Sequence, residues 1–192
     1  MDASSGFGLR LARNFGLPDA PSLATPSAGQ PRFAVTRIAR QIEAGPLELE
    51  LPREDKMLVL LFLIDLDRLE MRRMGEVASA QACARGSIGI FDLEDGASFS
   101  VEGQLDCLAF AIAHHAMRGL ADRIARLHAR GPSSRHLHCP LGCLDPTVEQ
   151  IGLAVLPLLR SPERMAPAFL DHIGLALITH LIAAYGRTRP DH

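Results

Sequence analysis

Strand-forming residues recur at short intervals between residues 32 and 113, and no segment with helical periodicity interrupts them. The runs are rich in β-branched, aromatic and other large apolar residues. They are RFAVTRIARQIE, MLVLLFLIDL, LEMRRMGE, SIGIFDLE, ASFSVEG and LDCLAFAIA. GPLELELPRED, which follows the first run, is interpreted as a breaker, and Glu94-Asp95-Gly96 as a turn. A parallel sheet would need helical crossovers between its strands. The series therefore predicts an antiparallel sandwich or barrel.

Helical periodicity begins after Ala113. HHAMRGLADRIARLHA repeats apolar residues every three or four positions, which predicts a helix beginning at His114. A second helix is predicted to begin at Thr147 and to kink or end at Pro157, and a third to span about 162–185. The predicted fold class is therefore α+β, with about three helices after the strands.

Residues 1–31 differ from the rest, because proline, glycine and small residues separate their bulky apolar residues. This composition predicts an extended arm that lies on the body of the domain and forms no layer of it. We expect a single domain over 1–186, divided into the arm (1–31), a β-barrel part (32–113) and a helical part (114–186). Residues 187–192 are expected to begin a linker.

The 192-residue chain has a formal net charge of −2, so we expect no direct binding to nucleic-acid phosphates. Its longest apolar run, MLVLLFLI, is far shorter than the roughly 18 residues of a membrane span. No secretion signal is apparent, and the four cysteines fit a reducing compartment. These observations predict a cytoplasmic protein that does not associate with membranes.

Catalytic and cofactor signatures have no match in the chain. GFGLRL carries two glycines but neither a third glycine nor a preceding strand, so it is not a dinucleotide-binding loop. No phosphate-binding lysine loop or nucleophile elbow is present. No histidine precedes His114, which argues against a metal centre among the strands. We expect no catalytic residue, no cofactor and no enzymatic activity.

The segment HLHCPLGC at residues 136–143 is the most metal-like in the chain, because imidazole and thiolate groups are preferred zinc ligands. Structural zinc sites usually combine two separated ligand pairs, whereas these four residues lie in one segment that includes Pro140. We expect a connecting loop with solvated side chains, and a zinc site is the alternative. His114 and His115 are likewise expected to be local polar residues at a helix start.

The last predicted strand, LDCLAFAIA, alternates large and small residues. Leu108, Phe110 and Ile112 are large, and they alternate with Cys107, Ala109 and Ala111. Successive residues of a strand face opposite sides of the sheet. The small-residue face is therefore either closely covered, for example by the arm, or it lines a cavity that could hold a small ligand.

The third predicted helix is apolar almost all round, so more than one of its sides must be covered. One side is expected to pack on the strands. Another side is expected either to be buried as part of a monomer's core or to meet a partner subunit in a homodimer. The residues predicted for the dimer interface are Phe169, Ile173, Leu177, His180, Leu181 and Ala184.

Several segments together resemble the amino-terminal regulatory domain of bacterial transcription regulators of the AraC family. They are FGLPDAPSLAT, PRFAVTRI, IFDLE, LDCLAFAI and DHIGLALITHLIAAYG, in the order of arm, strands and a long final helix. The resemblance implies a cupin-like barrel that senses a small-molecule effector, helices that dimerise, and a separate domain with two helix-turn-helix motifs that binds DNA. Only RTRPDH follows Gly186, so the DNA-binding domain is expected to be missing from this chain.

The resemblance does not identify the effector. The residues nominated to bind it are Phe33, Arg37, Ile90, Asp92, Cys107, Ala109 and Ala111. Arg37 or Asp92 would orient a polar group of the ligand. A free-standing cupin-like metal-binding protein or enzyme that uses HLHCPLGC remains the alternative function.

Overall fold

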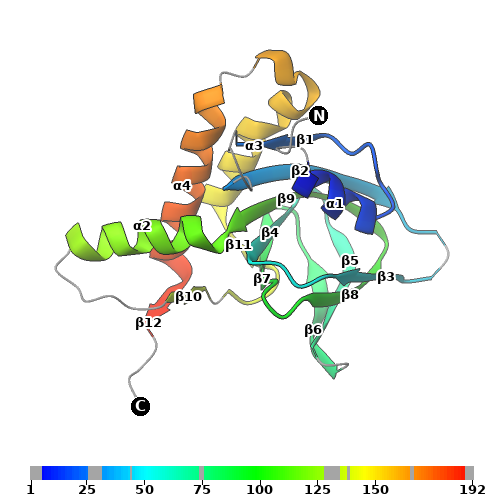
Figure 1. Cartoon of the computed structure of the whole chain (residues 1–192). Helices are drawn as coiled ribbons and strands as arrows, with labels where there is room; N and C mark the ends of the chain where they lie inside the picture. The colour runs from blue at the N-terminus through cyan, green and yellow to red at the C-terminus, as the bar shows by residue number, and fades with distance from the viewer. Residues whose placement is uncertain are drawn as a thin grey trace.

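The computed structural model describes residues 6–25, 32–43, 45–73, 76–127, 135–137, 139–164 and 167–188 (Figure 1). The strands are β1 (Ser22–Ala24), β2 (Phe33–Gln41), β3 (Leu47–Leu51), β4 (Lys56–Phe62), β5 (Leu66–Arg73), β6 (Glu76–Cys83), β7 (Ser87–Asp92), β8 (Ala97–Glu102), β9 (Gln104–Ala113), β10 (Arg135–Leu137), β11 (Cys143–Leu144) and β12 (Gly186–Thr188). The α-helices are α1 (Gly6–Asn14), α2 (His114–Leu127), α3 (Pro146–Arg160) and α4 (Pro167–Tyr185).

Two antiparallel sheets form the body of the protein. The larger sheet has the order β1-β2-β9-β4-β7-β11, and the smaller has the order β3-β8-β5-β6. Strand β9 lies inside the larger sheet, where Phe110 is opposite Val35 on one side and Val59 on the other. Helices α2, α3 and α4 gather on one side of these sheets (Figure 1). The predicted α+β fold class, an antiparallel sandwich followed by about three helices, is confirmed.

The first hydrophobic core lies between the two sheets, and both contribute to it. The larger sheet supplies Ile38, Leu58, Leu60, Phe62, Phe91, Cys107 and Ala109, and the smaller supplies Leu49, Leu51, Leu66, Leu69, Phe99 and Val101. The second core lies between the outer face of the larger sheet and the helices. It includes Val59, Leu61, Leu108, Phe110, Val155, Leu177 and Leu181. Each face of the larger sheet is thus covered, which explains the continuous apolar sequence of β4.

The predicted extended arm is wrong, because its first part is the helix α1 and its last part is the strand β1. Leu11 lies in α1, and Phe15 directly follows the helix, with its amide donating a 3.4 Å hydrogen bond to the carbonyl oxygen of Leu11. They are 3% and 2% exposed and join the core between the sheets. The side chain of Arg40 donates a hydrogen bond of 2.5 Å to the carbonyl oxygen of Phe15. This N-terminal segment is therefore part of the folded core.

Two strands of the smaller sheet were missed in the sequence. GPLELELPRED was interpreted as a breaker, but it contains β3, in which Leu49 and Leu51 are buried while Glu48 and Glu50 are exposed. This alternation is the pattern of a half-buried strand. Strand β6 was missed because most of its residues are exposed, so burial leaves no pattern in its sequence. The Glu94–Gly96 turn is confirmed, with a φ of +76° at Gly96.

The helical part begins at His114 as predicted, and two of its details differ from the sequence expectation. Helix α3 continues through Pro157 to Arg160, so the helix does not end at the proline. Gly186, Arg187 and Thr188 form β12, which pairs with β10. The chain therefore folds back after α4 at a place where a linker was expected to begin, and residues 189–192 lie outside the described residues.

Candidate functional site

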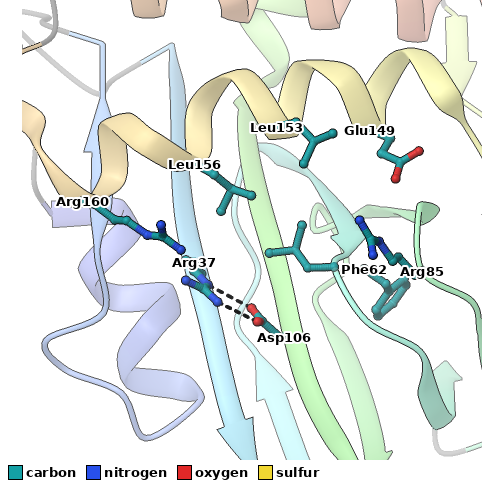
Figure 2. A pocket seen from close by; sticks show the side chains of 9 residues that line it. Arg37, Phe62, Arg85, Asp106, Glu149, Leu153, Leu156 and Arg160 are labelled. Carbon is teal, nitrogen blue, oxygen red and sulfur yellow. Dashed lines mark hydrogen bonds and ion pairs between the residues drawn. The ribbon is translucent and has the colours of Figure 1, made fainter.

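Arg37 and Asp106 form a two-pronged ion pair on the helix-facing side of the larger sheet. The Nε atom of Arg37 lies 3.0 Å from Oδ1 of Asp106, and Nη2 lies 2.7 Å from Oδ2. The side chains are 30% and 16% exposed. The hydrogen bond to Asp106 raises the pKa of Arg37, although burial opposes this shift. The pair fixes the guanidinium plane beneath the C-terminal end of α3 (Figure 2).

A cavity of about 230 Å³ lies between this ion pair and α3, and we call it the arginine cavity. Glu149, Leu153, Leu156 and Arg160 border it from α3, because their spacing of four, three and four places them along one side of the helix. The sheet and its connections supply Arg37, Phe62, Leu63, Arg85 and Asp106. Figure 2 shows Arg160 reaching from the helix toward Arg37.

The charges of the arginine cavity are distributed unevenly. Three arginines and two carboxylates line it, so the lining carries one excess positive charge. Asp106 is engaged by Arg37, and Glu149 lies against Gly86 at the opposite end from Arg160. Within the part of the chain that the structure describes, no hydrogen bond or ion pair engages the guanidinium of Arg160 or Arg85. Between the charged ends, Leu63, Leu153 and Leu156 are apolar, and Phe62, whose ring belongs to the core between the sheets, also borders the cavity.

The structure does not bring the nominated ligand-binding residues into one cavity. Arg37 lines the arginine cavity, whereas Phe33 lines an open groove between α2 and α4. Ile90 and Asp92 border a third depression, together with residues 137 and 139–141. The nominated residues of β9 are Cys107, Ala109 and Ala111, which are 0%, 1% and 4% exposed. Cys107 and Ala109 belong to the same core as Leu11 and Phe15 of the N-terminal segment, as the close-covering alternative proposed.

His114 is not the solvated polar residue that the sequence suggested. It is buried at the junction of β9 and α2, with a 2.9 Å hydrogen bond between Nδ1 and Oδ1 of Asp55. Its Nε2 atom lies 3.2 Å from Oδ1 of the nominated Asp92. The hydrogen bond with His114 lowers the pKa of Asp55, with burial opposing. Asp92 therefore lies beside the ring of His114, although Nε2 makes no hydrogen bond among the residues that the structure describes.

HLHCPLGC is more structured than a loop. Its beginning belongs to β10, and its end belongs to β11, which extends the larger sheet beside β7. Cys139 and Cys143 are partly buried, and burial, reinforced by Cys143, raises the pKa of the Cys139 thiol to about 12. His138 and the side chain of His136 lie outside the described residues. Among the residues described, no group of three or more potential ligands could hold a metal ion.

Asp145 joins α3 to α4. Its Oδ1 accepts hydrogen bonds of 3.0 Å from the backbone amides of Thr147 and Val148, and so caps α3. Its Oδ2 accepts 2.7 Å hydrogen bonds from His180 Nε2 and from the hydroxyl of Tyr185 on α4. Burial alone would raise the pKa of Asp145, but these hydrogen bonds lower it overall.

The predicted dimer-interface residues occupy different environments. Leu177 and Leu181 are fully buried in the chain's own core, and His180 is bonded to Asp145. Phe169 is 40% exposed, and Ala184 is also exposed. Leu175, which was not nominated, is 47% exposed. Residues 168–185 of α4 are long and apolar enough to cross a membrane by length and composition, and 33% of them are buried. A core helix of a soluble protein satisfies the same criterion.

Sequence reasoning identified Arg37 but missed the rest of the arginine cavity. The spacing of Glu149, Leu153, Leu156 and Arg160 was a usable signal, because it marks one side of α3. No comparable signal connected Arg85 or Asp106 to Arg37. Arg85 lies in the turn between β6 and β7, and β6 itself was not predicted.

The protein is thus an α+β fold, an antiparallel sandwich with helices on one side and a small basic cavity beneath α3. The chain is similar to the AraC-like transcriptional activator CuxR, with 11% identity, a TM-score of 0.48, and coverage of 90% of this chain and 59% of that chain.

Two cupin domains are also similar to this chain. For the Cupin_2 domain of an XRE family transcriptional regulator from Enterobacter cloacae, the values are 15% identity, a TM-score of 0.31, and coverage of 43% of this chain and 81% of that chain. A cupin 2 conserved barrel domain protein from Salinispora arenicola CNS-205 has 13% identity, a TM-score of 0.35, and coverage of 57% and 83%, respectively. No protein-family model and no curated protein matches the chain.

Proposed function

We propose that this chain is the effector-sensing and dimerisation domain of a bacterial transcription regulator of the AraC family. The role is cytoplasmic and non-enzymatic. A small molecule would bind in the arginine cavity, and a DNA-binding domain outside residues 1–192 would respond to the resulting change in the helices. The sequence resemblance to that family supports the proposal, and one structural observation carries it.

That observation is the position of the arginine cavity between two elements that belong to different layers. A ligand that contacts both Arg37 of β2 and Arg160 of α3 would favour the arrangement in which α3 lies against the sheet. Asp145 connects α3 to α4 through two short hydrogen bonds. A movement of α3 would therefore change the position of α4. The ligand can shift the equilibrium between the arrangement with α3 against the sheet and the arrangement with α3 moved away only by as much as its affinity for the two differs.

The exposed side of α4 supports the dimerisation part of the proposal. Phe169, Ala176 and Ala183 recur every seven positions along this side with Leu175 beside them, and the exposed His172 and Thr179 lie between them. Large exposed apolar side chains gathered on one surface are typical of interaction sites. A second copy of the chain would cover this side, while Leu177 and Leu181 would remain in the core of each protomer.

A repression assay tests the proposed function. The chain is fused to a DNA-binding domain that occupies its operator only as a dimer, and repression of a reporter gene is measured. The fusion should repress, and Leu175→Glu should abolish repression because it places a charge on the exposed side of α4. Leu144→Glu is the matched control, since Leu144 is 65% exposed on β11, and it should repress normally. Equal repression by the fusion and by the DNA-binding domain alone would contradict the proposal.

A further inference from the structure

The excess positive charge of the arginine cavity indicates what kind of molecule can bind there. Two of the N–H donors of Arg37 are used by Asp106, and Arg37 has three more. Arg160 points toward this guanidinium from the opposite wall (Figure 2). Two positive groups that converge on one end of a cavity repel each other unless an anion lies between them. Asp106 balances only one of them.

The remaining lining restricts the rest of the ligand. Phe62, Leu63, Leu153 and Leu156 border the middle of the cavity and provide no charged group. At the other end, Arg85 and the carboxylate of Glu149 lie near each other (Figure 2). The volume of about 230 Å³ is below the roughly 300–1,000 Å³ of sites for drug-sized ligands. The cavity therefore fits a small molecule with one charged end and a short apolar body.

We infer that the arginine cavity binds a small organic anion, whose carboxylate or phosphate group lies between Arg37 and Arg160 and whose apolar body packs on Leu153 and Leu156. Guanidinium groups suit this role because their planar donors match carboxylate and phosphate oxygens in pairs. The inference deepens the proposed sensing function and rests on it for the consequence of binding. The bound anion would join β2 to the last residue of α3.

The alternative for this cavity is a purely structural cluster in which Arg160 is solvated and no ligand enters. The two readings differ in a measurable way. If the cluster is purely structural, anions will bind no better than neutral molecules of the same shape, and replacing Arg160 will affect binding no more than replacing another exposed arginine. If the cavity is a binding site, anions will bind better than neutral molecules, and replacing Arg160 will weaken their binding more than replacing another exposed arginine.

The test is calorimetric titration of the purified 192-residue chain with four probes: hexanoate, hexanamide, butyl phosphate and inorganic phosphate. Hexanoate or butyl phosphate should bind with a Kd of about 1 mM or tighter, and hexanamide at least about tenfold more weakly, because it lacks the charge. Tighter binding of hexanoate would indicate a carboxylate ligand, and tighter binding of butyl phosphate would indicate a phosphate ligand. Inorganic phosphate should bind more weakly than butyl phosphate, because it lacks the apolar body.

Variants locate the site. Arg160→Gln should weaken binding of the preferred anion at least about tenfold, which is the loss expected for a hydrogen bond to a charged group. Arg13→Gln removes the same charge from an exposed position on α1 that does not line the cavity, and it should bind like the parent. Arg160 is itself exposed, so circular dichroism should show a folded Arg160→Gln protein.

The inference is overturned if no anion binds, if hexanamide binds as tightly as hexanoate, or if Arg160→Gln and Arg13→Gln weaken binding equally. These outcomes leave the repression assay untouched, so a failed anion site and a failed regulatory function are separable. Anion binding that leaves the repression by the fusion unchanged would support the site and contradict its role as an effector site.

Discussion

The Nε2 atom of His180 lies 2.7 Å from Oδ2 of Asp145, so one buried carboxylate joins the end of α4 to the start of α3. Asp145 is 4% exposed, and both of its carboxylate oxygens accept hydrogen bonds from donors within the protein. A buried carboxylate with several hydrogen bonds stabilises the native arrangement, whereas removing it leaves buried donors unsatisfied. The contact between the two helices should therefore depend strongly on this residue.

Replacing Asp145 by alanine should lower the free energy of unfolding by about 3 kcal/mol, because the helix cap is lost and the donors of His180 and Tyr185 lose their acceptor. Urea denaturation monitored by circular dichroism measures the change. Asp171→Ala is the matched control on α4, since Asp171 is exposed, and it should change stability by less than about 0.5 kcal/mol. Equal effects of the two substitutions would contradict the structural role of Asp145.

The stability contributed by Asp145 should be lost in acid. Its pKa in the folded protein is below its ordinary value of 3.8, so the folded state favours the charged form. The contribution is complete above the unfolded pKa and disappears as the pH falls through the lower folded pKa. Unfolding free energies of the parent and of Asp145→Asn, measured between pH 7 and pH 2.5, should converge at the acid end. A constant difference across this range would show that the charge of Asp145 has no part in stability.

The N-terminal segment should be essential for folding. Leu11→Ala removes a side chain that is 3% exposed in the core between the sheets and should cost about 2–5 kcal/mol. Leu144→Ala makes the same change at a site that is 65% exposed, and its effect should be small. Thermal denaturation compares the two. A Leu11→Ala protein as stable as Leu144→Ala would mean that α1 is a dispensable arm.

Gly152 allows α3 to approach the larger sheet closely. A Cβ atom there would meet the side chain of Leu61 and lie 3.1 Å from Cδ1 of Leu108. Gly152→Ala should therefore cost about 1–3 kcal/mol, even though alanine favours helix formation. Gly119→Ala on α2 has no atom within 4 Å of the new Cβ and should stabilise the protein by about 0.5–1 kcal/mol. The two substitutions should change the free energy of unfolding in opposite directions. Stabilisation by both would contradict the close approach of α3 to the larger sheet.

The sequence by itself determined the fold class and most of the elements that form the cores. The strands β2, β4 and β7–β9 and the start of α2 were predictable, because their residues are buried on one or both faces and burial imposes a periodic apolar pattern. Where burial is absent, the pattern is absent too, and the exposed β6 was missed for that reason. The N-terminal helix was missed because its glycine-rich sequence has poor intrinsic helix propensity, and packing of Leu11 and Phe15 on the sheets outweighs it.

Only the tertiary structure decided which polar residues meet. Arg37, Asp106 and Arg160 lie on three elements and line one cavity, while Asp145 reaches His180 and Tyr185 across 35 and 40 positions of sequence. Local periodicity indicates which side of an element faces the core, but it contains no information about which element lies opposite. Strand order, register and the approach of α3 to the sheet determine those partners, and they result from the packing of the whole chain.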